Sequence, residues 1–148
     1  MVGGYSCLDI ANKLTDIYNK SMDTKKILII EDEKNIVTSL KMYLEHSGFE
    51  VSVADNGLDG IKKGQEIKPD MILLDLVLPK VNGYTVCKSL KEDVNTKNIP
   101  LVIMSARTSK EDIEKAFASG ADNYLEKPFS VMQIGNIIKK YLGEKDNG

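Results

Sequence analysis

Acidic side chains lie within or directly after two apolar segments of the sequence. Asp75 lies within the apolar run of residues 71–78, and Glu31 and Asp32 come directly after residues 27–30. Short apolar runs bounded by turn-forming residues are typical of strands buried on both faces of a parallel sheet. In open α/β sheets, ligands bind beyond the carboxyl ends of such strands. An ionised Asp75 at that edge would be available to a cation or to a phosphorus centre.

Two other polar residues also follow apolar segments. Ser105 comes after residues 99–104, and Lys127 comes after residues 123–126. A hydroxyl and an ammonium group close to Asp75 would hold phosphate oxygens through hydrogen bonds and charge. Each of these residues, taken singly, could be an ordinary solvated loop residue or a helix cap. Their joint occurrence at the ends of strands is much harder to obtain by chance.

The elements that must position these residues alternate between strands and helices. Five strand–helix units are expected between residues 25 and 142, with an edge strand over 49–53 and a closing helix over 130–142. Strict alternation predicts a parallel sheet with helices on both faces, because each right-handed crossover lays its helix against the sheet. The predicted fold class is α/β, a flavodoxin-like, doubly wound sheet of five parallel strands in the order 2-1-3-4-5.

Apolar spacing also predicts which helix faces point toward the sheet. Ile113, Ala116 and Phe117 are expected on the inner face of the penultimate helix. The inner face of the closing helix is expected to contain Val131, Ile134, Ile137, Ile138 and Tyr141. Gly60 and Gly64 are expected to weaken the second helix, since each costs about 1 kcal/mol against alanine.

The predicted strand order places the first and third strands side by side. Glu31, Asp32 and Asp75 then converge on one crevice at the edge of the sheet. Crowded carboxylates repel one another, and a hard divalent cation with oxygen ligands relieves that repulsion. Mg²⁺ is favoured over Ca²⁺, because a site with few carboxylates and room for water and phosphate is typical of Mg²⁺.

Composition disfavours several classes of partner. The 148 residues carry a net charge of -2, with 42% hydrophobic and 28% charged residues. Without a basic surplus, direct nucleic-acid binding is not expected. No apolar run approaches the roughly 20 residues of a membrane helix, so no membrane association is expected. The distant Cys7 and Cys87 favour reduced thiols and a cytoplasmic location, with Cys87 in the core.

The first residues differ from the rest of the chain. An amphipathic helix is predicted within an extension over residues 1–23, from apolar residues at helical spacing: Leu8, Ala11, Leu14, Tyr18 and Met22. Ser6 with Asp9 resembles a capping arrangement at its start. The helix could pack on its own domain, on a second copy or on another protein, or translation could start at Met22. The main domain is expected over 24–143, followed by a tail over 144–148.

Four segments, taken in their order and spacing, are highly specific. They are Ile27-Leu28-Ile29-Ile30-Glu31-Asp32-Glu33, Leu74-Asp75-Leu76-Val77-Leu78-Pro79-Lys80-Val81-Asn82-Gly83, Met104-Ser105-Ala106 and Tyr124-Leu125-Glu126-Lys127-Pro128-Phe129. On these segments, residues 24–143 resemble a response-regulator receiver domain of two-component signalling. The resemblance is to a stand-alone receiver of the chemotaxis or sporulation type, or to a receiver fragment of a longer protein.

The resemblance implies a role for each site residue. Asp75 would be the phosphoacceptor, and Lys127 would pair with a phosphate oxygen. Mg²⁺ would be held by Glu31, Asp32 and Asp75 together with the backbone carbonyl of Val77.

The resemblance also implies a conformational switch. Ser105 would turn inward to hydrogen-bond the phosphate, and Tyr124 would follow it into the vacated space. The face made by the fourth helix, fifth strand and fifth helix of the receiver would then change its binding to a partner. The Lys127–Pro128 peptide bond resembles the cis peptide of the family.

The implied function is receipt of a phosphoryl group from a sensor histidine kinase or a histidine phosphotransfer protein, with the signal passed to a downstream effector protein or output domain. On this reading the chain is not an enzyme, because it acts only on itself by self-phosphorylation and autodephosphorylation. A pseudo-receiver that only docks a protein partner is the alternative. A Mg²⁺-dependent phosphatase of the haloacid-dehalogenase type is disfavoured, because Val77 stands where that class needs a second Asp as general acid.

Overall fold

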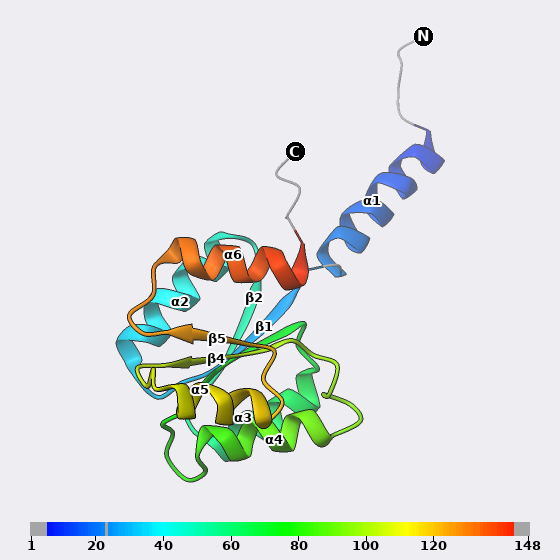
Figure 1. Cartoon of the computed structure of the whole chain (residues 1–148). Helices are drawn as coiled ribbons and strands as arrows, with labels where there is room; N and C mark the ends of the chain where they lie inside the picture. Colours follow the sequence, from blue (N-terminus) through cyan, green and yellow to red (C-terminus); the bar gives the residue numbers. More distant parts are fainter. Residues whose placement is uncertain (1–5, 23, 144–148) are drawn as a thin grey trace.

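The computed structural model describes residues 6–22 and 24–143 (Figure 1). Within these residues, five parallel strands form one sheet in the order β2-β1-β3-β4-β5, which confirms the predicted fold class. The strands are β1 (Lys26–Ile30), β2 (Glu50–Ala54), β3 (Met71–Asp75), β4 (Leu101–Ser105) and β5 (Asn123–Glu126). The helices in the same ranges are α1 (Cys7–Met22), α2 (Lys34–His46), α3 (Gly57–Ile67), α4 (Gly83–Glu92), α5 (Lys110–Ala118) and α6 (Val131–Leu142).

The central strands have apolar residues on both faces, as the sequence predicted. In β1, Leu28 and Ile30 face one side of the sheet, and Ile27 and Ile29 face the other, because side chains alternate along a strand. Helices α3, α4 and α5 cover the first side, and α2 and α6 cover the second (Figure 1). Strand β2 lies at an edge of the sheet, and Ala54 is its one buried residue.

Two strand ends differ from the prediction. Strand β3 ends at Asp75, so the last three apolar residues of its run lie in the following loop. The backbone leaves the sheet there, because the carbonyl of Leu76 accepts a hydrogen bond from the amide of Gly83 at 2.8 Å. Strand β4 begins at Leu101 rather than two residues earlier. Pro100 precedes it and has no N–H group to extend the ladder.

Two residues predicted on inner helix faces are exposed. Phe117 of α5 is 46% exposed and Val131 of α6 is 61% exposed, whereas Ala116, Ile134 and Ile138 are buried as predicted. Phe117 directly follows Ala116, and one residue is a rotation of about 100° around a helix, so the two cannot share one inward direction. Val131 lies in the first turn of α6, where it borders a groove rather than the core.

The glycines of α3 are packing positions rather than weak points. Gly60 and Gly64 are both buried, and the helix continues through Ile67. A Cβ at Gly60 would lie 2.7 Å from the Cδ1 of Ile30, and one at Gly64 would lie 2.9 Å from the Cδ2 of Leu90. The absent side chains let α3 approach β1 and α4 closely. That packing offsets the intrinsic cost of glycine, which the sequence-based expectation did not include.

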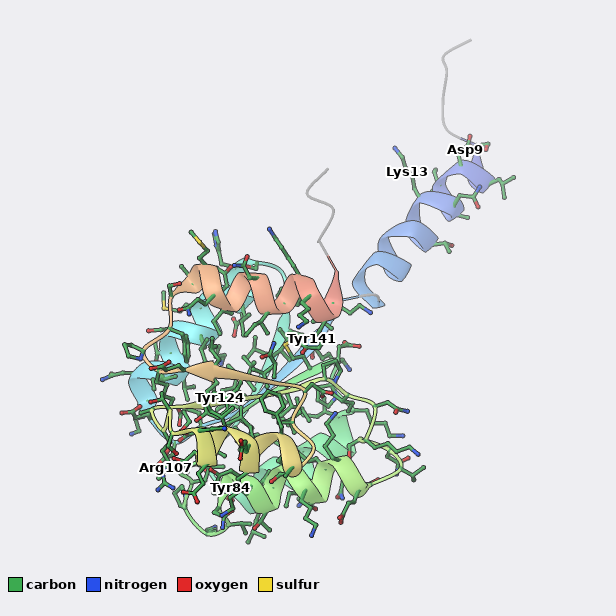
Figure 2. The ribbon with its side chains drawn as sticks, viewed as in Figure 1. Asp9, Lys13, Tyr84, Arg107, Tyr124 and Tyr141 are labelled. Atoms are coloured by element: carbon green, nitrogen blue, oxygen red, sulfur yellow. The ribbon has the colours of Figure 1, made fainter. Side chains whose placement is uncertain are left out.

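Helix α1 forms where the sequence predicted it and begins with the expected cap. The hydroxyl of Ser6 accepts a hydrogen bond from the amide of Asp9 at 3.1 Å, and the Asp9 carboxylate accepts one from the amide of Ser6 at 3.2 Å. The helix points away from the sheet and its flanking helices, with Asp9 at its far end (Figures 1 and 2). The side chains of Tyr18 and Met22, and the predicted tail over 144–148, lie outside the described part of the chain.

Two expectations from composition can be compared with the structure. Cys87 is buried in the core as predicted, and both cysteines are free thiols. Among the residues described, no helix has the length and apolar content needed to cross a bilayer.

Candidate functional site

Strand register brings the predicted site residues to one edge of the sheet. Ile30 of β1 pairs with Leu74 of β3, which places Glu31 beside Asp75 one residue further along. On the other side of β3, Ser105 lies one residue beyond the β4 partner of Asp75. Because parallel strands all end at the same edge, residues from distant parts of the sequence meet there.

The loop after β3 folds back over the end of that strand. The amide of Gly83 donates to the carbonyl of Leu76 at 2.8 Å, and a Cβ on Gly83 would lie 2.5 Å from the carbonyl oxygen of Asp75. No side chain fits so close to this backbone. Asn82 caps α4, since its side chain accepts a hydrogen bond from the amide of Thr85 at 3.0 Å. Sequence reasoning found the turn here but missed the close approach that requires glycine.

Lys127 is the cation that joins the acidic residues. Its Nζ lies 2.6 Å from Glu31 Oε1, 3.3 Å from Asp75 Oδ1 and 3.9 Å from Glu33 Oε2. Desolvation lowers the pKa of Lys127, but the hydrogen bond to Glu31 and the charge of Asp75 outweigh it, so the net pKa is raised. The ammonium group therefore stays charged at neutral pH. The peptide bond between Lys127 and Pro128 is cis.

The acidic residues that were expected to hold a metal lie together. One carboxylate oxygen from each of Glu31, Asp32 and Asp75 lies within 4.8 Å of the other two. Glu31 is fully buried, and its desolvation and the neighbouring Asp75 raise the pKa of Glu31 to about 7 despite the opposing effect of Lys127. One ammonium group does not offset the charge of these carboxylates, so the site favours a further cation. Clustered carboxylate oxygens are ligands that Mg²⁺ uses in proteins, and the donor set fits that ion.

The two predicted switch residues both contact the backbone of Arg107. Ser105 is buried, and its Oγ accepts a hydrogen bond from the amide of Arg107 at 3.0 Å. The half-buried Tyr124 donates a hydrogen bond from its hydroxyl to the carbonyl of Arg107. The segment that follows β4 is therefore held from β4 and from β5 at once.

An open pocket of about 440 Å³ lies at this edge of the sheet. The predicted site residues that line it are Asp32, Asp75, Val77, Ser105 and Lys127. Glu31 does not line the pocket but contacts it through Lys127. Glu33, Ala106 and Arg107 also line the pocket, and sequence reasoning gave no site role to Glu33 or Ala106. Glu33 was recognisable as a carboxylate after a strand, whereas the small apolar side chain of Ala106 carries no chemical signal.

Comparison with known proteins finds the same kind of domain. The family model described as the response regulator receiver domain matches residues 27–139. The chain is 39% identical over 118 residues to the alkaline phosphatase synthesis transcriptional regulatory protein PhoP of Bacillus subtilis. This match covers 80% of this chain and 48% of PhoP. It is 36% identical over 120 residues to the polar-differentiation response regulator DivK of Brucella anthropi, which covers 81% of this chain and 98% of DivK.

Solved structures agree with these sequence relatives. A two-component response regulator from Clostridium difficile aligns with a TM-score of 0.76 and 31% identity, over 84% of this chain and 100% of that structure. The receiver domain of the sensor histidine kinase PA1611 from Pseudomonas aeruginosa PAO1, with a magnesium ion coordinated in its active site cleft, aligns with a TM-score of 0.76 and 25% identity, over 82% of this chain and 99% of that structure.

The relatives differ in length. This chain spans about half of PhoP, at 48%, and nearly all of DivK, at 98%. The matched region begins in β1 and ends in α6, and so contains residues of all five strands and the acidic edge described above. The chain belongs to the family of response regulator receiver domains.

Proposed function

We propose that Asp75 accepts a phosphoryl group from a sensor histidine kinase or a histidine phosphotransfer protein, in a Mg²⁺-dependent reaction. A carboxylate oxygen of Asp75 bonds to phosphorus as the phosphorus–nitrogen bond of the donor breaks and its electron pair returns to the imidazole. The product is an acyl phosphate on Asp75. The observation that carries the proposal is the position of Asp75 at the open pocket, with Lys127 Nζ 3.3 Å from its Oδ1.

The neighbouring residues control the charge around this reaction. Glu31, Asp32 and Asp75, with the carbonyl of Val77, are the residues that would hold Mg²⁺. When bound, the ion offsets the negative charge that repels an incoming phosphoryl group. Lys127 contributes a second positive charge, and its 2.6 Å contact with Glu31 keeps the ammonium group at the pocket.

The hydroxyl of Ser105 provides a link from the phosphate to the rest of the domain. It accepts a hydrogen bond from Arg107, and because a hydroxyl also has a hydrogen to donate, it can bind a phosphate oxygen. Tyr124 contacts the same Arg107 backbone from β5. When Ser105 moves toward the phosphate, the Arg107 backbone and Tyr124 therefore move with it. This movement changes the α5–β5–α6 face, where a downstream effector protein or output domain binds.

The reaction is confined to the chain's own carboxylate. The chain takes a phosphoryl group onto Asp75 and later loses it to water, and it has no separate substrate to turn over. The free thiols of Cys7 and Cys87 support the cytoplasm, where thiols stay reduced, as its compartment.

Intact-mass measurement after incubation with acetyl phosphate and Mg²⁺ tests the proposal. The wild-type chain should gain one phosphoryl group of about 80 Da, and Asp75→Asn should gain none. Asp93→Asn is the matched control, because it removes a carboxylate from the loop after α4, and it should be modified like the wild type. An equal gain in Asp75→Asn would show that another group is the acceptor.

Beryllofluoride with Mg²⁺ provides a second measurement that does not depend on the lifetime of an acyl phosphate. Amide NMR signals of Asp75, Ser105 and Tyr124 should shift on its addition. Absence of both the mass increase and these shifts would favour the pseudo-receiver, a domain that docks a partner without phosphorylation.

A further inference from the structure

Helix α1 carries an apolar face that the rest of the described chain leaves uncovered. Leu8, Ile10 and Leu14 are 69%, 49% and 61% exposed. Ile10 and Leu14 are four residues apart and therefore lie on one face of the helix. Isolated helices shorter than about 12–15 residues are marginal in water, and most helical stability comes from packing of an amphipathic face. Helix α1 has 16 residues and projects from the domain, so packing of its apolar face on a further surface would stabilise it.

The domain has a groove between α2 and α6 that is apolar, like the exposed face of α1. Its volume is about 440 Å³, and its lining includes Ile36, Leu40 and Tyr43 from α2 and Val131 and Ile134 from α6. Val131 is 61% exposed although it is a large apolar residue. Both helices pack on the same face of the sheet (Figure 1).

We propose that two copies of this chain form a symmetric dimer in which α1 of each copy lies in the α2/α6 groove of the other. Ile10 and Leu14 are the side chains that enter the groove and contact Ile36 and Val131. An amphipathic helix that lies in an apolar groove is a common form of recognition, and exchange of one element between two copies gives a closed dimer.

The connection to β1 favours a second copy over the helix's own groove. Only residues 23–25 separate Met22 from Lys26, and these four steps span at most about 14 Å. The carbonyl of Lys25 already accepts a hydrogen bond from the amide of Glu50 at 2.9 Å. To reach the groove of its own chain, α1 would have to lie outside α2 and α6, which themselves lie outside the sheet. It would then be two layers of packing away from β1, at about 8–10 Å for each layer. The connection is too short for that path, whereas the observed direction of α1 leaves it open to another molecule.

Two reciprocal sites bury twice the area that one docked helix would bury. A helix of 16 residues is about 24 Å long and about 10 Å wide. Covering it removes area from the helix and from the groove, and does so twice in a symmetric dimer, for a total of about 1,000 Å². Specific, stable interfaces bury about 1,200–2,000 Å², so this dimer would lie at the weak end of biological interfaces, whereas docking of a single helix would bury only half as much.

The groove adjoins the pocket that contains Asp75. Lys127 and Ala106 line both. A helix bound in the groove would therefore lie beside the edge of the sheet where the proposed phosphoryl donor approaches. The dimer does not require phosphorylation, so its test and the test of the proposed function can fail separately.

Sedimentation velocity of the full chain, at concentrations from about 1 to about 200 µM, tests the dimer. The wild type should change from monomer to dimer across this range. Leu14→Asp on α1 and Val131→Glu in the groove should each raise the dissociation constant more than about tenfold. Both side chains are exposed, so neither substitution disturbs the core, and circular dichroism melts check this.

Val94→Glu is the matched control. Val94 is 74% exposed and lies outside both α1 and the groove, so this variant should dimerise like the wild type. A wild type that stays monomeric throughout the range would overturn the proposal and leave the helix's own groove or another protein as its partner. A dimer that neither Leu14→Asp nor Val131→Glu weakens would also overturn it, because another surface would then hold the two copies together.

Discussion

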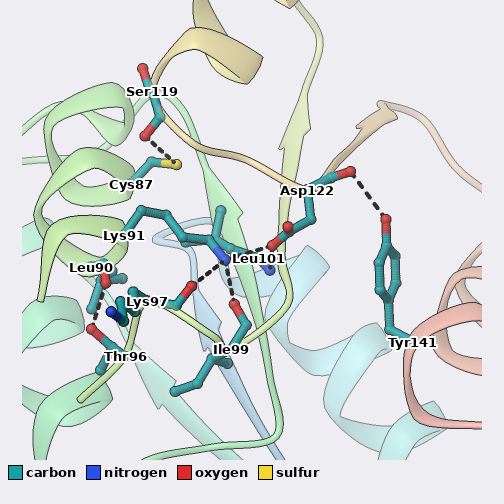
Figure 3. Close-up of polar contacts among 10 residues, drawn as sticks. All are labelled: Cys87, Leu90, Lys91, Thr96, Lys97, Ile99, Leu101, Ser119, Asp122 and Tyr141. Carbon is teal, nitrogen blue, oxygen red and sulfur yellow. Dashed lines mark hydrogen bonds and ion pairs between the residues drawn. The ribbon is translucent and has the colours of Figure 1, made fainter. Parts of the chain in front are cut away.

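Lys91 and Asp122 form an ion pair at the edge of the sheet opposite the functional pocket (Figure 3). The Nζ of Lys91 lies 2.6 Å from Asp122 Oδ2 and donates to the carbonyls of Ile99 at 2.7 Å and Lys97 at 3.2 Å. The same carboxylate oxygen accepts a hydrogen bond from the amide of Leu101 at 2.8 Å. The pair therefore joins α4 to the beginnings of β4 and β5, and its removal should destabilise the fold.

The burial of the pair sets the magnitude. The side chain of Lys91 is 13% exposed and that of Asp122 is 38% exposed, so water screens the pair only in part. Hydrogen bonds to charged groups contribute about 1.5–3 kcal/mol each. Lys91→Met retains most of the aliphatic stem that lies against Gly120 but removes the donor of two backbone carbonyls and leaves the Asp122 carboxylate with only the amide of Leu101 as its donor. It should lower the free energy of unfolding by about 3 kcal/mol, and Asp122→Asn by about 2 kcal/mol.

A double-mutant cycle by urea denaturation measures the interaction itself. The coupling energy between Lys91 and Asp122 should be about 1.5 kcal/mol or more. The pair of Lys41 and Glu45 on α2 is the control, since its atoms are 3.7 Å apart and its side chains are 49% and 50% exposed. Its coupling should stay below about 0.5 kcal/mol.

A coupling energy between Lys91 and Asp122 as small as that of the control pair would contradict this prediction. Water would then solvate the two charged groups as favourably as they bind each other, and the ion pair would add nothing to the free energy of unfolding. In native buffer, phosphoryl uptake by Lys91→Met should equal that of the wild type, because the pair and Asp75 lie at opposite ends of the strands.

Three further predictions concern single positions. Gly83→Ala should destabilise the fold by about 2 kcal/mol, because its Cβ would lie 2.5 Å from backbone atoms. Gly135→Ala should be neutral or stabilising, because its Cβ would meet only the hydroxyl of Tyr43, at 2.9 Å. Thermal melts that give the two variants the same stability would contradict this prediction. In EDTA, stability should fall by up to about 3 kcal/mol as the pH rises from 4.5 to about 7, because the raised pKa of Glu31 favours its protonated form in the folded state. Urea denaturation across this pH range should show a much smaller fall for Glu31→Gln, and an unchanged slope would exclude this carboxyl as the cause. Burial raises the pKa of Cys87 to about 12, so iodoacetamide should modify only Cys7 in the native chain and both cysteines in denaturant; two adducts on the native chain would contradict this.

The fold and the edge that carries the site could be predicted because their signals are local. The runs 27–30 and 101–104 are apolar along the chain, and strands buried on both faces need such runs. The alternation of strands with helices then implies parallel strands, and parallel strands end at one edge. Glu31 and Lys127 each directly follow a strand and Asp75 ends one, so their convergence was predictable from topology.

Other properties of the molecule depend on partners that are far away in the sequence. The contact of Glu33 with Lys127 and the approach of Gly60 to β1 depend on how the elements pack. Phe117 and Val131 have the spacing of inner-face residues, yet both are exposed. Spacing reports the direction of a side chain within one helix, but only the neighbouring elements decide whether anything lies in that direction.

Local sequence patterns and long-range packing set different properties of this molecule. The sequence determined the strands and helices, their order in the sheet and the edge at which Asp75 lies, because hydrophobic periodicity and chain connectivity act within and between consecutive elements. The tertiary structure decided the ion pair of Lys91 with Asp122, the pocket around Asp75 and the direction of α1 away from the domain. These features depend on distances between atoms of separate elements, and no local pattern in the sequence specifies such distances.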